Sequence, residues 1–235
     1  MRSNPLSDFF DFIYPKVCSG CGALLMQPEQ ILCTYCLSHL PYTQYETLLK
    51  NPVFLNFCGR IPILDACSLL YFHKGGRVQH LLHLLKYDYR PDIGLFLGKL
   101  LGEKLAEISS FQNIDVLVPV PLHPKKIKKR GYNQCDLLIK GMQPYFHAEI
   151  QNHLLNKKEY TESQTQKNRT HRWDNVHSSF ALSTENTQIQ NLTGKHILLI
   201  DDVITTGATL ESCARELLKI PNVNISIATI AAPIY

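Results

Sequence analysis

Two adjacent carboxylates followed at once by hydroxyls and a glycine could bind a phosphorylated ligand. In the stretch LLIDDVITTGATLESCARELL (198–218), Asp201 and Asp202 end an apolar run. Residues 205–209, Thr-Thr-Gly-Ala-Thr, then lead into a segment with helical periodicity. The first N–H groups of a helix have no partner within the helix, and they favour an anion together with the helix dipole. The pattern therefore predicts a phosphate on the turn, and against the aspartates a hydrogen-bond donor or a group that carries Mg²⁺.

The plainer alternative is that the two aspartates simply end a strand and that Thr206 or Thr209 caps the helix. A sugar phosphate satisfies the pattern more fully, because its hydroxyls can donate to the carboxylates while its phosphate accepts from the turn.

A basic segment one strand earlier is the second candidate. VPVPLHPKKIKKRGYNQ (118–134) contains most of the local basic excess of a chain whose net charge is only +4. Alone, residues 125–130 are typical of a solvated surface loop. Beside a phosphate site, the same cations would suit a multiply charged anion such as pyrophosphate.

Four cysteines form two C-x2-C pairs separated by eleven residues, a spacing that suits one tetrahedral Zn²⁺. These are Cys18, Cys21, Cys33 and Cys36. A closed set of four sulfurs favours a structural metal, since a catalytic zinc keeps an open position. A redox pair is less favoured because no thioredoxin-like βαβ pattern surrounds them, and His39 is a weaker candidate ligand. We expect the other four cysteines to be small buried residues: Cys58, Cys67, Cys135 and Cys213.

The elements that must position these residues alternate between strands and helices. Expected strands cover 65–73, 115–122, 196–203 and 222–233, and expected helices cover 77–87, 91–108 and about 208–219. Right-handed crossovers between them predict an α/β fold with a parallel sheet and a ligand at the carboxyl ends of its strands. The polar segment 156–195 is expected to contain a mobile loop.

Two domains are expected, with a boundary near residue 64. Residues 1–64 hold the cysteine pairs and many prolines, which is typical of a small metal-stabilised module, and residues 65–235 form the α/β domain. The 45% apolar content and modest charge suit a small anionic ligand better than coating of nucleic acid. No apolar run approaches the roughly 20 residues of a membrane span, and the start does not resemble a cleavable signal, so we expect a cytoplasmic protein without membrane insertion.

The chain resembles the ComF or ComFC competence proteins and their phosphoribosyltransferase-like relatives. The matching pieces span nearly the whole sequence: CSGC…CTYC, LLKYDYRPDIGLFLGKLL, VPVPLHPKKIKKRGYNQ, YTESQTQKNRTHRWDNVHSSFAL and ILLIDDVITTGATLESCARELL. LLIDDVITTGATL is similar to the phosphoribosyl-pyrophosphate (PRPP) motif of type I phosphoribosyltransferases, which favours ligand binding over a plain strand end.

The resemblance implies a type I phosphoribosyltransferase-like sheet with a zinc-ribbon-like module in front. It also implies that PRPP binds with Mg²⁺, its ribose hydroxyls on Asp201 and Asp202. The 5′-phosphate would lie on Thr205, Thr206, Gly207, Ala208 and Thr209. The pyrophosphate side would comprise Val120, Pro121, Lys129, Arg130, Gly131, Tyr132, Asn133 and Gln134. A flexible loop over the ligand would include Ser163, Gln164, Thr165 and Arg172.

The resemblance leaves three functions open. The first is a PRPP-binding protein that assists DNA uptake in natural transformation, with single-stranded DNA and the uptake machinery as possible partners. The second is an active phosphoribosyltransferase on an unidentified base or amine; ammonia supply from glutamine is excluded because position 2 is Arg rather than a catalytic Cys. The third is a regulatory module that binds PRPP without turnover.

Overall fold

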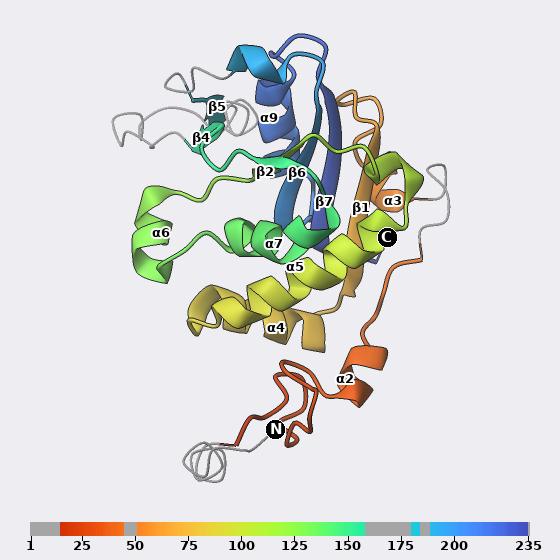
Figure 1. The fold of residues 1–235 in the computed structure, drawn as a ribbon, viewed down its shortest axis with the longest axis vertical. Coiled ribbons are helices and arrows are strands. Elements are labelled where there is room, and N and C mark those ends of the chain that lie inside the picture. The colour runs from red at the N-terminus through yellow and green to blue at the C-terminus, as the bar shows by residue number, and fades with distance from the viewer. Residues whose placement is uncertain (1–14, 45–50, 158–179, 184–188, 235) are drawn as a thin grey trace, which may run out of the picture.

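A parallel five-stranded sheet forms the centre of the molecule (Figure 1), and it confirms the expected α/β fold. The computed structural model describes residues 15–44, 51–157, 180–183 and 189–234. The strand order is β1-β7-β6-β2-β3, and every neighbouring pair is parallel. The strands are β1 (Asp65–Phe72), β2 (Val116–Pro119), β3 (Glu149–Ile150), β6 (His196–Val203) and β7 (Asn224–Pro233).

Helices cover both faces of this sheet, so its inner strands are apolar on both sides. One face is covered by α4 (Arg77–Tyr87), α5 (Pro91–Ala106) and α7 (Gln134–Met142), and the other by α3 (Pro52–Leu55) and α9 (Ala208–Leu217). Alternation along β6 divides its side chains between two cores: Leu198 and Ile200 face α4 and α5, whereas Ile197 and Leu199 face α9.

Helices α5 and α7 pack with their backbones in direct contact. A Cβ atom added to Gly98 would overlap the carbonyl oxygen of Leu138, and one added to Gly141 would overlap the carbonyl oxygen of Leu95. Glycine at these two positions is therefore what allows the helices to approach so closely.

The basic run, for which a surface loop was the simplest interpretation, is instead helix α6 (Pro124–Arg130). Proline suits its first turn, and the His123 side chain accepts the Lys125 N–H at 3.2 Å. The helix ends at Gly131, whose φ of 84° is the left-handed conformation that a helix end favours.

We did not predict the antiparallel pair of β4 (Leu155–Lys157) and β5 (Phe180–Leu182), which lies mostly within residues 156–195, the segment expected to contain a mobile loop. The remaining short elements are α2 (Thr34–Ser38), η2 (Ser109–Phe111), η3 (Gln143–Tyr145) and η6 (Ile189–Leu192). Among the described residues, no helix is long and apolar enough to cross a membrane.

The cysteine module, residues 15–44, lies beyond α4 at one end of the molecule (Figure 1). Its buried Leu32 and Leu40 belong to the same core as the apolar face of α4. The backbone N–H of Thr43 donates to the carbonyl of Leu69 at 3.0 Å. By contrast, α3 contacts β1 and belongs to the core that β6 and α9 share. The domain boundary at residue 64 stays a prediction.

Candidate functional site

The two adjacent aspartates at the carboxyl end of β6 face different neighbours, as strand alternation requires. Asp201 accepts the S–H of Cys135 at 3.5 Å and the N–H of Asp202 at 2.8 Å. Asp202 is buried and faces α4, where its Oδ2 lies 2.6 Å from Nζ of Lys86. The same Oδ2 accepts from Nε2 of Gln134 at 3.1 Å. The carboxylates thus extend the site to both faces of the sheet.

The protonation of Asp201 is set by its surroundings. Burial, and next the negative charge of Asp202, raise the pKa of Asp201 to about 7. The Asp202 N–H and the ammonium of Lys86 act in the opposite direction without cancelling this rise. Asp201 therefore titrates near neutral pH, and a cation or hydroxyl donor beside it would favour its charged form.

The turn after β6 forms a small hollow with the shape expected of an anion site. Residues 203–210 and Asp201 line a cavity of about 40 Å³. Gly207 caps α9 with φ of 75°, and no side chain caps the helix there. Thr205 and Thr206 are exposed, and Ala208 lies in the first turn of α9. The Ala208 N–H has a long contact of 3.5 Å to the Thr206 hydroxyl, and the first N–H groups of a helix, which lack helical partners, favour an anion there.

Arg60, which no sequence pattern singled out, supports this turn from behind. Its Nη1 donates to the carbonyl of Thr206 at 3.0 Å and to that of Asn56 at 2.9 Å. Its Nη2 pairs with Glu211, which also pairs with Arg215 at 2.7 Å. Glu211 is thus neutralised by two arginines, and its charge does not oppose an anion at the start of α9.

The predicted pyrophosphate side lies beside Asp202 and is connected to it. Asn133 caps α7 and donates from Nδ2 to the carbonyl of Val120 at 3.0 Å, which joins the helix to the end of β2. Arg130 donates from Nη1 to Oε1 of Gln134, whose Nε2 reaches Asp202. Arg130, Gln134 and Asp202 therefore form one chain of polar contacts.

A cavity of about 300 Å³ opens next to this chain, and its lining is basic and aromatic. It is lined by Lys86, Tyr87, Tyr89, Lys126, Lys129 and Arg130. The hydroxyl of Tyr89 donates to the carbonyl of Lys129 at 2.8 Å, and the guanidinium of Arg130 lies 5.7 Å from the centre of the Tyr87 ring. Four cations on one cavity suit a multiply charged anion.

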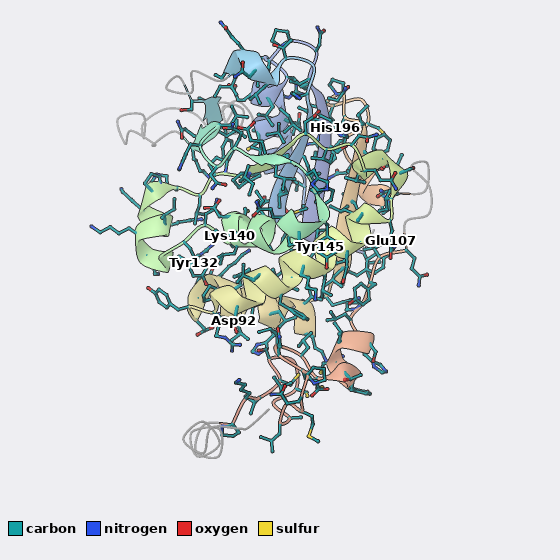
Figure 2. The ribbon with its side chains drawn as sticks, in the orientation of Figure 1. Asp92, Glu107, Tyr132, Lys140, Tyr145 and His196 are labelled. Carbon is teal, nitrogen blue, oxygen red and sulfur yellow. The ribbon has the colours of Figure 1, made fainter. Side chains whose placement is uncertain are left out.

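Three other predicted residues lie near this cavity or at the end of β2. Tyr132, between α6 and α4 in Figure 2, donates from its hydroxyl to the carbonyl of Leu85 at 2.6 Å. Gly131 ends α6 at a point where an added Cβ would lie 3.6 Å from the ring of Tyr89, and Pro121 is half-buried after β2. The four residues predicted for the flexible loop lie outside the described residues: Ser163, Gln164, Thr165 and Arg172.

Lys86 was not among the predicted site residues, although it both lines this cavity and contacts Asp202. It lies in LLKYDYR, a segment quoted above only for its family resemblance. The apolar periodicity of α4 could have placed Lys86 on the helix, but not against Asp202, which is distant in sequence.

The four predicted cysteines come together in the cysteine module. The Sγ atoms of Cys18, Cys21, Cys33 and Cys36 all lie within 4.8 Å of one another. Two of them, on Cys21 and Cys33, are 3.8 Å apart. Zinc bound tetrahedrally at 2.3 Å needs sulfur atoms about 3.8 Å apart, so the cluster fits a structural zinc. His39 instead bonds the carbonyl of Tyr35 at 2.8 Å.

The thiols of the cluster differ in acidity. Burial raises the pKa of Cys18, but N–H donors from Cys33 and Gly20 outweigh it and bring that pKa down to about 6. Burial and the neighbouring thiols raise the pKa of Cys36 to about 12. Of these two thiols, Cys18 is therefore the one more readily present as a thiolate, the form that a metal binds.

The expectation for the other cysteines was right at three positions and wrong at one. Cys67, Cys135 and Cys213 are buried, but Cys58 is exposed. Cys58 lies in the turn after α3, where its Sγ faces the carbonyl of Phe54 at 3.7 Å rather than a core.

Comparison with known proteins connects both parts of the chain to one group. A phosphoribosyl transferase domain matches residues 127–234. The DNA utilization protein YhgH of Escherichia coli (strain K12) is 30% identical over 211 residues, covering 86% of this chain and 84% of that protein. Competence protein F of Haemophilus influenzae is 28% identical over 211 residues, covering 87% and 85%.

A third relative, competence protein ComFC of Bacillus subtilis, is 39% identical over 105 residues, covering 44% of this chain and 38% of that protein. The YhgH match covers 86% of the chain, which is more than residues 65–235 alone make up. The chain therefore belongs to the ComF family of phosphoribosyltransferase-like proteins.

Proposed function

We propose that this protein binds PRPP with Mg²⁺ at the carboxyl ends of β6 and β2, and that it serves DNA uptake. The observation that carries the proposal is the arrangement of two anion sites around one pair of carboxylates. The small hollow at residues 203–210 suits a single phosphate, whereas the basic cavity suits a pyrophosphate. Asp201 lines the hollow, and Asp202 contacts Lys86 in the lining of the cavity, so the two carboxylates lie between the two anion sites.

The site chemistry divides the ligand in the way its charges require. In our proposal the 5′-phosphate lies on Thr205 to Thr209, where N–H groups and hydroxyls are donors. The pyrophosphate lies against Lys129, Arg130 and the start of α7, with Gln134 linking it to the aspartates. Mg²⁺ would be carried by the phosphate oxygens and carboxylates, since it prefers oxygen ligands.

We propose that the cysteine module is part of a zinc-ribbon-like unit of residues 1–64 and that it has a structural role. Its closed tetrathiolate leaves no position for a substrate. Its buried Leu32 and Leu40 pack in the same core as the apolar face of α4.

The role in DNA uptake follows the relatives named for competence and DNA utilization. We propose that the protein acts on the cytoplasmic side and that exposed lysines of α6 contact DNA phosphates. Replacing Lys125, Lys126, Lys128 and Lys129 by Gln should make the affinity for a single-stranded oligonucleotide less dependent on salt. An unchanged slope would exclude α6 as the DNA contact.

Calorimetric titration with Mg²⁺-PRPP tests the central proposal. The parent protein should bind PRPP, and an Asp201→Asn/Asp202→Asn variant should lose at least about tenfold in affinity, because neutral amides accept hydroxyls less strongly than carboxylates. The matched control is Glu103→Gln/Glu107→Gln, which removes two charges at exposed positions away from the site. Absence of binding by the parent, or equal losses in both variants, would contradict the proposal.

A further inference from the structure

Lys86 occupies a position between the two halves of the proposed site. It lies in the last turn of α4, and its Nζ is 2.6 Å from Oδ2 of Asp202. The side chains of Lys86 and Asp202 are only 23% and 8% exposed. A pair so shielded from water interacts more strongly than a surface ion pair, so this contact defines the arrangement of the free site.

The oxygen that Lys86 contacts is already shared. Oδ2 of Asp202 also accepts from Gln134, and Gln134 in turn accepts from Arg130. Both lone-pair directions of Oδ2 are thus occupied by protein donors. A ribose hydroxyl could approach this oxygen only after one donor leaves.

Lys86 also lines the basic cavity, where an alternative partner would bind. The cavity has three further cations in Lys126, Lys129 and Arg130. Within the described parts of the chain, no carboxylate forms an ion pair with any of these three. A pyrophosphate there would give Lys86 a partner with more negative charge than the single carboxylate of Asp202.

The walls of the cavity are held by contacts that do not depend on Lys86. Tyr89 is bonded to the carbonyl of Lys129, and Tyr132 to that of Leu85. Arg130 is held between Gln134 and the Tyr87 ring. Lys86, by contrast, has a flexible four-carbon stem and a rotatable ammonium, so it can change partner without movement of the backbone.

We propose that Lys86 determines the selectivity of the site for a ribose that carries a pyrophosphate over one that carries only its 5′-phosphate. It pairs with Asp202 in the free protein and moves to the pyrophosphate oxygens when PRPP binds. This exchange leaves Oδ2 of Asp202 open to a ribose hydroxyl. Ribose 5-phosphate offers no such partner, so Lys86 stays on Asp202 and competes with the sugar. The inference rests on the proposed function.

The test compares two ligands in the same buffer with Mg²⁺, PRPP and ribose 5-phosphate, by calorimetry. The variants are Lys86→Met, which removes the charge and keeps the length, and Lys86→Arg, which keeps the charge. Lys99→Met is the matched control, since Lys99 is exposed on α5 and lies outside the cavity lining. Lys86→Gln gives the same comparison if the Met variant does not fold.

We expect Lys86→Met to lose about tenfold or more in affinity for PRPP, as removal of a charged hydrogen-bond donor does. Its affinity for ribose 5-phosphate should be unchanged or higher, because the competitor for Asp202 is gone. Lys86→Arg should retain more of the preference for PRPP than Lys86→Met, and Lys99→Met should bind both ligands like the parent.

Two other results would overturn the inference. Equal losses for both ligands would mean that Lys86 acts only by supporting Asp202, and an unchanged affinity for PRPP would mean that it never reaches the pyrophosphate. In both cases binding of PRPP by the parent would leave the proposed function intact. Failure of the parent to bind PRPP would instead refute the proposed function, and this inference with it.

Discussion

The cysteine module and the β6–α9 site are organised by opposite means. In residues 15–44, short turns and one helix of five residues position four sulfurs, and few large apolar side chains are buried. At the β6–α9 site, a strand buried on both faces positions two carboxylates, and the turn is braced by Arg60 from a distant segment.

The difference concerns what each region needs to keep its shape. A small segment with a limited core depends on a ligand or cross-link for its order, whereas a site at a sheet edge inherits order from the sheet. The module should therefore be sensitive to loss of metal, and the phosphate site to changes in backbone and charge.

Removal of the metal should produce the largest effect. Cys36→Ser, or a strong chelator, should lower bound zinc from about one per chain to none and make the module a substrate for limited proteolysis, because metal binding supplies folding free energy. PRPP affinity should change little. Cys58→Ser is the control, since Cys58 is exposed and outside the cluster. Full resistance to proteolysis without zinc would remove the distinction between the two regions.

Gly207→Ala, which adds one methyl group, should lower both the stability of the protein and its affinity for PRPP. The added Cβ would lie 2.8 Å from Nδ2 of Asn56 and 3.0 Å from the ring of Phe57, at a residue with φ of 75°. We expect a loss of about 1 to 3 kcal/mol in the free energy of unfolding, together with weaker PRPP binding. Denaturant titration and calorimetry measure the two quantities.

Gly194→Ala separates the two causes. Gly194 has nearly the same φ, 74°, but open space where its Cβ would be. It should lose only the cost of the left-handed conformation and leave PRPP affinity unchanged. Equal losses at the two positions would show that the contact with Asn56 and Phe57 has no consequence.

Asp201→Asn should stabilise the free protein as pH rises. The pKa of Asp201 is raised from 3.8 to about 7, so between these values the folded chain holds a proton that the unfolded chain releases. Stability consequently falls as pH rises through this range. Relative to the parent, Asp201→Asn should gain at least about 1 kcal/mol at pH 8 and much less at pH 4.

Asp115→Asn is the control of opposite sign. The N–H of His196 lowers the pKa of Asp115, since it outweighs the effect of burial. That carboxylate therefore stabilises the fold above its unfolded pKa, and the contribution disappears as pH falls. Asp115→Asn should thus be less stable than the parent at neutral pH. The same sign for both variants would refute the assignment.

Glu29→Gln should have the smallest effect of these variants, and it tests how the pH affects the stability of the cysteine module. The N–H groups of Met26 and Thr34, and the Thr34 hydroxyl, lower the pKa of Glu29. The exposed carboxylate thus holds the turn before Cys33 above its unfolded pKa. The variant should release zinc at a slightly higher pH during acid titration, followed by a metal indicator. An identical midpoint would mean that the cluster alone maintains this turn.

Elements with strong periodicity were predictable almost to the residue. The expected strand 196–203 and helix 77–87 match β6 and α4, because apolar residues mark the faces that each buries. Helix α6 escaped because its lysines carry no apolar period; its ends are set by Pro124 and Gly131. The two-residue strand β3 is too short to leave a pattern.

The residues of the candidate site also differ in how far the sequence could predict them. Asp201 and Asp202 could be located because the strand and the turn are contiguous in sequence. Lys86 and Arg60 could not, since each reaches the site through packing, and Arg60 meets Thr206 across 146 residues. Local sequence predicts which groups end a strand, but tertiary packing decides what lies against them.

The glycines at the crossing of α5 and α7 determine the distance between these two helices, and rotation of side chains cannot change it. Because Gly98 and Gly141 bring main chain against main chain, any larger residue at either position would force the helices apart. Asn133 and Gln134 lie at the start of α7. The distance between α5 and α7 therefore also affects where these two residues lie relative to β2, α4 and the basic cavity. Ligands of different size must then be accommodated by rotation of side chains. Substitution of Gly98 or Gly141, which lie outside the cavity, would consequently change the ligand preference of the site.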